Sequence, residues 1–322
     1  MATYNVGSGQ TYGTIQATID AAAAGSPPDY DAEIVVYPGN YNAAFRLDQI
    51  SGGWCLPAFI RAQDPNDKPV IDGTSISGVG QAVRIDSNVQ NGVTQRPKLQ
   101  DLVFENWSNS SNASNGIIYA ANGPSITVSR CTFQDSDAQA IRYLTTGSLI
   151  DRCFFDATQT CVEVSGGGNP TVTVRNCRMK PAAGYSAVNM VGTNTVVQNC
   201  TALVKCGASD KGMIAGTVQN TIVQNDSGYS GQYGVSVATL AEYCVIGGTW
   251  TAYTSGTTGS GNQTGSGSNF ADFSGNGTGG LDWDTGALQE DAGVTISAVA
   301  VDFYGTSRPQ GLAYDIGDYE LP

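Results

Sequence analysis

The sequence predicts an all-β protein, a right-handed parallel β-helix solenoid with a short N-terminal capping helix, and three observations lead to this prediction. A short apolar segment recurs at intervals of 22, 24 and 23 residues. A second apolar segment follows each copy about ten residues later. Glycine contributes 41 of the 322 residues and charged residues only 13%, which favours many turns and few long amphipathic helices. Short strands at a fixed interval are typical of a solenoid.

The first recurring segment is aligned on a cysteine. Its copies are residues 128–133, 150–155, 174–179 and 197–202, and they place Cys131, Cys153, Cys177 and Cys200 in one slot. Residues 99–104 fit the same frame with Leu102 in the cysteine slot, while residues 223–225 and 241–244 continue it less regularly. The second strand of each repeat is expected at 116–118, 140–142, 161–163, 187–189, 213–214 and 234–236. Because one repeat cannot bury its own apolar face, neighbouring repeats must stack, about 4.8 Å apart.

We interpret Cys131, Cys153, Cys177 and Cys200 as a column of small thiols that fills equivalent positions of the core. A zinc site would bring close pairs of ligands, whereas one cysteine in each repeat does not converge on an ion. Disulfides between neighbouring repeats are disfavoured because we expect synthesis in a reducing cytoplasm.

The chain is expected to form one continuous domain in three parts. Residues 1–80 hold the cap helix and the first rungs, and Thr14 is a candidate N-cap for a helix over residues 15–22 that covers the open end of the solenoid. Residues 81–250 form the central rungs, and residues 251–322 form a loop-rich closing region. Within it, residues 251–280 are rich in Gly, Ser, Thr and Asn, which indicates a surface loop that Leu281 and Trp283 pack against the last rungs.

The two ends of the chain resemble the pectin-lyase-like β-helix superfamily. Its members often begin with an "IQxAIDAA" helix, a "PGxY" turn and an "IDG" strand, which correspond here to residues 15–22, 38–41 and 71–73. Residues 302–311 and 315–320 resemble the "DxxGxxRP" and "DIGAYE" ending of bacterial and viral members. The resemblance implies the fold and no single activity, since the superfamily contains lyases, hydrolases, esterases, epimerases, adhesins and phage virion proteins. In this tail we expect Asp302, Arg308, Asp315 and Glu320 to form a structural network that closes the last rung, with an active constellation as the alternative.

Charge and hydropathy restrict the partners. The net charge of −13 repels a phosphate backbone, so we expect no nucleic acid partner. No stretch approaches the roughly 18 apolar residues of a membrane span, and the first residues show no signal peptide, so we expect no membrane insertion and a product made in the cytoplasm.

The chain has no histidine, which excludes Ser-His-Asp triads and histidine metal sites. A β-helix enzyme would then need carboxylates on consecutive rungs, with calcium or with a basic side chain beside a uronate. The candidates are Asp135, Asp137, Arg142, Asp151 and Glu163, accompanied by Asp156, Arg175, Arg178 and Lys180. We interpret them as solvated turn and strand residues, and we keep a polysaccharide lyase or glycoside hydrolase, including a tailspike depolymerase, as the alternative. Calcium is expected only in the lyase alternative, and no other cofactor is expected.

The leading functional hypothesis is a non-enzymatic phage virion surface protein, either a head decoration or an accessory structural protein. Its partners would be other virion proteins or cell-surface glycans, and its place the virion surface after cytoplasmic synthesis. Tyr119, Tyr143 and Tyr233 would offer a glycan surface if they face outward, and otherwise pack at rung corners. The competing hypothesis is an extracellular or cell-surface bacterial adhesin, and a homo-oligomer is compatible with either.

Overall fold

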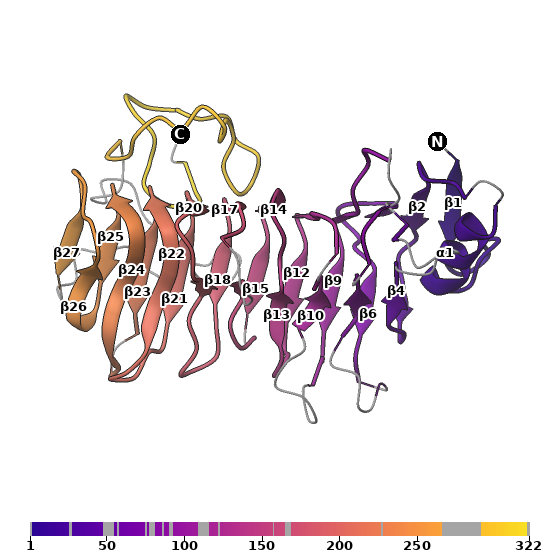
Figure 1. Ribbon diagram of the computed structural model, residues 1–322, viewed down its shortest axis with the longest axis horizontal. Helices are drawn as coiled ribbons and strands as arrows, with labels where there is room; N and C mark the ends of the chain where they lie inside the picture. The colour runs from indigo at the N-terminus through magenta and orange to yellow at the C-terminus, as the bar shows by residue number, and fades with distance from the viewer. Residues whose placement is uncertain are drawn as a thin grey trace.

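The protein is a right-handed parallel β-helix with one α-helix at its N-terminal end among the described residues (Figure 1). The computed structural model describes residues 2–25, 28–47, 55–56, 58–74, 76, 81–85, 87–89, 93–108, 116–121, 123–156, 158–164, 169–226, 228–265 and 291–320. Within these ranges the strands of the two sheets pair in parallel, as the sequence predicts.

Three rows of strands run along the axis, and one turn of the helix, a rung, contributes a strand to each row. The first row contains β1 (Thr3–Val6), β2 (Glu33–Val36), β5 (Phe59–Ala62), β8 (Lys98–Gln100), β11 (Thr127–Ser129), β14 (Ser148–Asp151), β17 (Val172–Arg175) and β20 (Thr195–Gln198). The second row contains β4 (Phe45–Arg46), β7 (Val83–Arg84), β10 (Gly116–Tyr119), β13 (Gln139–Arg142), β16 (Val162–Val164), β19 (Val188–Met190) and β26 (Thr249–Ser255). The long strands β22 (Lys211–Gln219) and β24 (Ser230–Glu242) run through both rows and join them into one sheet.

The third row is a separate sheet. It contains β3 (Asn40–Tyr41), β6 (Val70–Asp72), β9 (Val103–Glu105), β12 (Thr132–Gln134), β15 (Phe154–Asp156), β18 (Arg178–Lys180), β21 (Thr201–Val204), β23 (Ile222–Asn225), β25 (Val245–Gly247) and β27 (Gln263–Gly265). The expectation of two strands per repeat is therefore wrong for the central rungs, because the cysteine segment holds two strands, such as β11 and β12. Between them one residue adopts a left-handed conformation, for example Arg130 at φ 53° and Asn176 at φ 51°. Asparagine tolerates this region better than most residues, which explains the recurring Asn-Cys pairs.

The strand register confirms most of the predicted repeat. Leu99, Val128, Ile150, Val174 and Val197 lie opposite one another on successive strands of the first row. The alignment of residues 223–225 is wrong, because residue 218 pairs with Val197, whereas residue 223 pairs with residue 202 in the third row. The triplet Val-Gln-Asn occurs at both 218–220 and 223–225, and only the first copy keeps the rung spacing.

The N-terminal end is covered as predicted. Helix α1 (Ile15–Ala23) begins after Thr14, whose hydroxyl accepts a hydrogen bond of 3.1 Å from the backbone N–H of Ala17. Its apolar face buries Ile15, Ile19 and Ala22 against β1, β2 and β4. The helix therefore shields the first strand edges from solvent.

The solenoid continues beyond residue 250. Strands β26 and β27 pair in parallel with β24 and β25, so the prediction of a surface loop is wrong for their residues. Trp250 is buried and anchors this rung through a 2.8 Å hydrogen bond from its indole to the Gly247 carbonyl, which outweighs the local abundance of turn-forming residues. Residues 266–290, including Leu281 and Trp283, lie outside the described residues.

Residues 291–320 form the C-terminal segment, which folds back along the outside of the helix (Figure 1, yellow). Asn220, at the bend after β22, exchanges two hydrogen bonds with Val294. The backbone N–H of Asp318 donates to the hydroxyl of Thr201 on β21. Beneath the segment, Ile222 and Val245 of the third row pack against Ile316. The segment therefore covers the outer side of the third row and does not close the last rung.

Candidate functional site

The outward side chains of the second row form one column along the helix axis. In β4, β7, β10, β13 and β16 the residue that points into the core is apolar, and the next residue points outward. The register places these outward residues directly opposite one another on successive rungs. We call this column the arginine ladder; it consists of Arg46, Arg84, Tyr119, Arg142 and Glu163.

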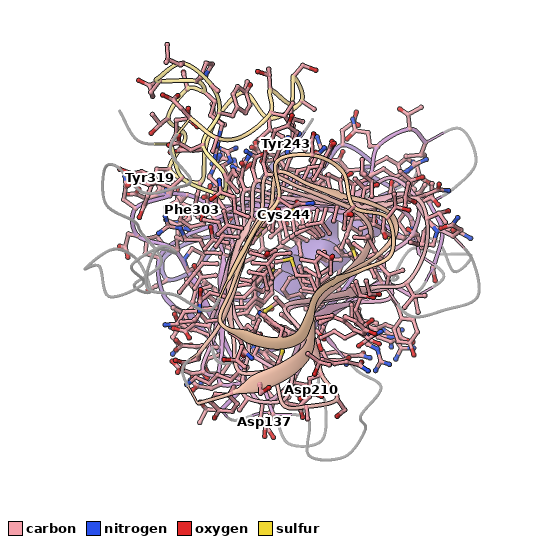
Figure 2. The ribbon with its side chains drawn as sticks, turned by 90° about the vertical axis from the view of Figure 1, so that its left-hand side faces the viewer. Asp137, Asp210, Tyr243, Cys244, Phe303 and Tyr319 are labelled. Atoms are coloured by element: carbon pink, nitrogen blue, oxygen red, sulfur yellow. The ribbon has the colours of Figure 1, made fainter. Side chains whose placement is uncertain are left out.

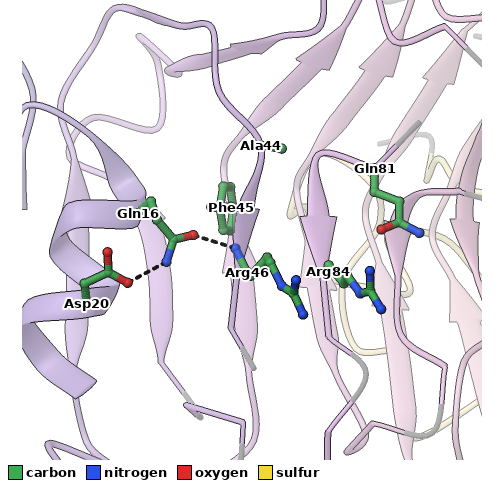
Figure 3. A pocket seen from close by; sticks show the side chains of 7 residues that line it. All are labelled: Gln16, Asp20, Ala44, Phe45, Arg46, Gln81 and Arg84. Carbon is green, nitrogen blue, oxygen red and sulfur yellow. Dashed lines mark hydrogen bonds between the residues drawn. The ribbon is translucent and has the colours of Figure 1, made fainter. Parts of the chain in front are cut away.

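The N-terminal end of the ladder is hollowed. A pocket of about 370 Å³ is lined by Arg46 and Arg84 together with Gln16, Gln81 and Asp20 (Figure 3). Helix α1 positions Gln16, whose amide donates to Asp20 at 2.8 Å and accepts the backbone N–H of Arg46 at 2.8 Å. Helix and sheet are thus joined at the pocket, and both arginine side chains extend to the same side of the sheet (Figure 3).

The middle of the ladder is aromatic. The ring of Tyr119 meets that of Tyr143 edge to face, with centroids 5.2 Å apart, and both residues are half-buried. Tyr143 follows β13 in a left-handed conformation at φ 61°, which is uncommon for a bulky residue. This conformation turns its ring against Tyr119 and places it 4.6 Å from the guanidinium carbon of Arg142. Tyr119 and Tyr143 therefore face outward beside the arginines, whereas Tyr233 lies farther along, with its ring 5.6 Å from Lys211.

At the next rung the ladder carries a carboxylate. Glu163 forms an ion pair with Arg142 at 3.5 Å and accepts a hydrogen bond from the side-chain amide of Gln139. The side chains of Arg142 and Glu163 are 12% and 10% exposed, respectively, so the pair is largely shielded from water. Beyond it the outward positions are uncharged, namely Asn189, Ile214, Ser236 and Ser255.

The candidate catalytic residues are divided among three places. Arg142 and Glu163 lie on the second row, as described. Asp135 and Asp137 follow β12 and line an open cleft of about 640 Å³ with Trp107, Gln159 and Tyr185. Viewed along the axis, Asp137 lies on the far side of the molecule from Phe303 and Tyr319 of the C-terminal segment (Figure 2).

Asp151 occupies the third place, on β14 of the first row. It forms ion pairs with Arg152 at 3.2 Å and with Arg175 at 3.0 Å. Arg175 in turn donates to the Ala298 carbonyl of the C-terminal segment at 2.6 Å. Asp156 and Lys180 form an exposed pair at 3.7 Å on the third row. The five candidates therefore do not form one constellation.

Arg178 has a structural environment that the sequence did not reveal. It is fully buried, forms an ion pair with Asp318 and donates to the Tyr304 hydroxyl at 2.9 Å. The rings of Phe303 and Tyr304 each lie 4.7 Å from its guanidinium carbon. Burial raises the pKa of Asp318, while the neighbouring Arg178 opposes that shift. Arg178 thus holds the C-terminal segment on the third row.

The tail residues named from the sequence surround a second buried arginine. Arg308 contacts Glu320 at 2.9 Å and donates to the Asp315 carbonyl at 3.2 Å. Asp302 accepts the backbone N–H groups of Thr306 at 2.7 Å and Glu320 at 3.2 Å. Burial raises the pKa of Glu320. These contacts stabilise the fold of the C-terminal segment itself.

The four cysteines of the column lie buried on consecutive rungs as free thiols. Each thiol donates to the carbonyl two residues earlier, at 3.4, 3.5, 3.1 and 3.2 Å for Cys131, Cys153, Cys177 and Cys200. Thr221 occupies the same slot on the next rung and makes the same bond at 2.8 Å. Burial raises the pKa of Cys131, Cys153 and Cys177 well above the ordinary value. From Cys131 to Thr221 the slot thus holds a small side chain that donates a hydrogen bond to the bend, whereas Leu102 fills it on the rung before.

Within the described part of the chain, no three His, Cys, Asp or Glu side chains gather closely enough to hold a metal ion. Calcium therefore stays an expectation of the lyase alternative. None of the described helices is long and apolar enough to cross a bilayer.

Sequence reasoning missed Arg46 and Arg84. They lie before residue 99, where the cysteine-centred repeat has not begun and the intervals between rungs are longer. The available signal was an apolar residue followed by arginine in two short strands, Phe45-Arg46 and Val83-Arg84. Without the register, nothing places these two dipeptides opposite each other.

No protein-family profile and no curated protein sequence matches the chain. Among solved structures it is similar to the pectin methylesterase of Aspergillus niger in a penultimately deglycosylated form, at 15% identity and a TM-score of 0.38, over 80% of this chain and 85% of that chain. It is similar to a pectin methylesterase mutant in complex with a hexasaccharide, at 14% identity and a TM-score of 0.38, over 79% and 82%. It is also similar to the pectate lyase Pel9A, at 13% identity and a TM-score of 0.38, over 100% and 98%.

At these identities and TM-scores, neither the fold nor an activity of this chain is inferred from the similarity. The assignment rests on the parallel register of the three rows and on the helix that covers their first rung. The chain is therefore a right-handed parallel β-helix.

Proposed function

We propose that this protein is a non-enzymatic, glycan-binding surface protein of a virion, and that it holds an acidic saccharide along the arginine ladder. The virion location follows the expectation from the sequence. The proposal of saccharide binding rests on the arginine ladder. Saccharide binding and the virion location are tested in separate experiments.

The observation that carries the proposal is the pair of arginines in register. Strands β4 and β7 place Arg46 opposite Arg84, and both side chains line the pocket. The molecule as a whole is strongly acidic, with a net charge of −13. The planar fork of a guanidinium suits carboxylate or sulfate oxygens, so two guanidinium groups beside one pocket favour a ligand with an acidic group.

The neighbouring rungs supply the other contacts that a saccharide requires. The half-buried Tyr119 and Tyr143 offer apolar ring surface for the C–H face of a sugar ring and hydroxyls for its polar edge. Gln16 and Gln81 bring amide groups to the pocket. A ligand that follows the ladder therefore meets charge first and aromatic surface next.

The arrangement of the acidic side chains favours binding over catalysis. Glycoside hydrolysis in most families needs two carboxyl groups on either side of one bond. On the ladder Glu163 is the one carboxylate, and Arg142 and Gln139 already hold it. Asp135, Asp137 and Asp151 lie on other parts of the solenoid.

Titration calorimetry with an acidic oligosaccharide tests the saccharide part. We expect Arg84→Gln to weaken binding by roughly 10- to 100-fold, because a hydrogen bond to a charged group contributes about 1.5–3 kcal/mol. The matched control is Arg61→Gln, which removes the same charge from the first row, where Arg61 pairs with Glu33 at 2.7 Å. Equal affinity in the two variants, or no binding by the unaltered protein, contradicts the proposal. Sedimentation with purified particles in a density gradient tests the virion location.

A second candidate function, a glycoside hydrolase or polysaccharide lyase, is favoured by one observation. Asp135 and Asp137 line the 640 Å³ cleft together with Tyr185, which is 37% exposed. Reducing ends and unsaturated products, measured on acidic and neutral polysaccharides with and without calcium, test it. Turnover that disappears in Asp137→Asn would replace the binding proposal by the enzymatic one.

A further inference from the structure

We propose that the C-terminal segment is an exchangeable docking module, which binds either to its own solenoid or to the same surface on a second copy of this chain. We call this surface the docking face. It lies on four successive rungs and consists of Arg175, Arg178, Thr201, Asn220, Ile222 and Val245. Exchange between copies does not require saccharide binding.

The segment is attached to the solenoid without strand pairing. Within the described residues, both sheets consist of strands that end before residue 266, and no residue of the segment pairs with them as a strand. A rung cannot leave its neighbours without breaking the hydrogen bonds of a sheet, whereas the segment can leave with both sheets intact. Undocking is therefore expected at a lower free energy than unfolding of the solenoid.

Contacts within the segment define its shape. The Arg308 guanidinium pairs with Glu320 and donates to the Gly317 carbonyl at 3.0 Å. The backbone N–H of Gly293 donates to the Tyr314 carbonyl at 2.7 Å, which joins the beginning of the segment to its last part. Because both partners of each bond belong to the segment, a second solenoid would receive a segment of the same shape.

The docking face and the segment are complementary in charge and in hydrogen bonding. The Asp318 carboxylate reaches the buried guanidinium of Arg178. Asn220 exchanges two side-chain hydrogen bonds with Val294, and its carbonyl accepts the backbone N–H of Gly317 at 2.8 Å. These contacts require one carboxylate and several backbone groups at fixed spacing, so a peptide of unrelated sequence would not satisfy them all.

Undocking would expose apolar side chains on both partners. Ile222 and Val245 of the docking face and Ile316 of the segment are fully buried and pack against one another. Since exposure of apolar surface to water is unfavourable, an open docking face and a released segment are expected to rebind. Nothing in these contacts distinguishes the chain's own segment from that of a second copy, because the two are identical.

The tether between solenoid and segment permits either arrangement. Residues 266–290 connect the end of β27 to the segment, and a fully extended chain of this length spans roughly 80 Å. The rung of Ile222 lies two rungs, about 10 Å, from that of β27, so the tether exceeds the distance to its own docking face. A tethered partner has an effective concentration on the order of 1 mM. We therefore expect the segment to bind its own solenoid in dilute solution and to exchange where copies are crowded.

Transfer of a labelled segment between two folded proteins tests the exchange. A specific protease site is inserted within residues 266–290, a fluorophore is attached at the C-terminus, and the folded protein is cleaved. It is then mixed with an equal amount of unlabelled cleaved protein that carries an N-terminal affinity tag. We expect the label to remain bound after cleavage and about half of it to be recovered with the tagged solenoid.

Arg178→Met in the tagged solenoid supplies the decisive variant. It removes the partner of Asp318, and we expect it to recover at least tenfold less label. The matched control is Lys205→Ala, which removes an exposed cation that pairs with Asp226 and is expected to recover as much label as the unaltered solenoid. If Arg178→Met does not fold, Asp318→Ala in the labelled protein takes its place, with the same expected loss.

The intact chain tests exchange between whole copies. Refolding from urea at micromolar concentration is expected to give monomers, and refolding at about 1 mM to give an additional dimer that persists on dilution, as measured by size exclusion with light scattering. A label that stays with its original solenoid, together with monomers at both concentrations, overturns the proposal. Equal recovery of label by the Arg178→Met and Lys205→Ala solenoids also overturns it, because the docking face would then not hold the segment.

Discussion

Replacing Asp318 with alanine is expected to destabilise the protein by about 3–5 kcal/mol. Asp318 and Arg178 are both fully buried and join the C-terminal segment to β18. Removing one partner of a buried ion pair leaves an uncompensated charge away from water, which costs about this amount. The stabilities of native domains lie at about 5–15 kcal/mol, so the loss is a large share of the total.

The surroundings of Arg178 place the expected value at the lower end of that range. Two aromatic rings at 4.7 Å and the Tyr304 hydroxyl at 2.9 Å stay beside the guanidinium when the carboxylate is gone. A desolvated cation–π contact stabilises a cation by about 2 kcal/mol. We therefore expect about 3 kcal/mol, and we expect the C-terminal segment to become the first part of the chain that proteases cleave.

Urea unfolding of the purified variant measures the change in free energy, and limited proteolysis reports on the segment. The control is Lys205→Ala, which breaks the exposed Lys205–Asp226 pair and is expected to cost less than about 1 kcal/mol. The double variant Arg178→Met with Asp318→Leu is expected to recover most of the loss, because it removes both charges. Equal stability of Asp318→Ala and Lys205→Ala would refute the view that this ion pair fastens the segment.

Two further predictions concern the core slot and acid stability. Cys177→Thr should be more stable than Cys177→Val by about 1 kcal/mol, as measured by urea unfolding. The two side chains have the same shape, but the threonine hydroxyl can donate to the Arg175 carbonyl, as the hydroxyl of Thr221 donates to the Gln219 carbonyl. A valine variant that is the more stable of the two would show that a hydrogen-bond donor is not required at residue 177. Hydrogen bonds from Thr74 lower the pKa of Asp72. The ionised carboxylate therefore stabilises the folded protein fully above the ordinary pKa of 3.8, and this stabilisation is lost as the pH falls through the lowered pKa. On acidification Asp72→Asn should lose less free energy of unfolding than the unaltered protein, and parallel pH profiles of the two proteins would contradict this.

The parts of the fold that can be predicted from the sequence are those set by short-range periodicity. The cysteine slot and the apolar segment after it mark two of the three rows, and Thr14 marks the start of the cap helix. The third row could not be separated, because a single left-handed residue such as Arg130 divides two strands without any glycine or proline. The position of the C-terminal segment depends on a pair 140 residues apart in sequence, Arg178 and Asp318, which no local pattern links.

The candidate site could not be predicted from the sequence, because the register of the parallel strands determines which side chains lie next to one another. Each of its arginines stands in an ordinary strand as a polar residue after an apolar one, and in isolation each suggests only a solvated face. Arg46, Arg84 and Tyr119 are separated by unequal numbers of residues, so a search for a fixed period does not align them. The parallel pairing does, and it also sets Glu163 beside Arg142. In a parallel solenoid the order of charges across rungs is therefore set by the strand register, and a change at one rung alters the environment of its neighbours about 4.8 Å away.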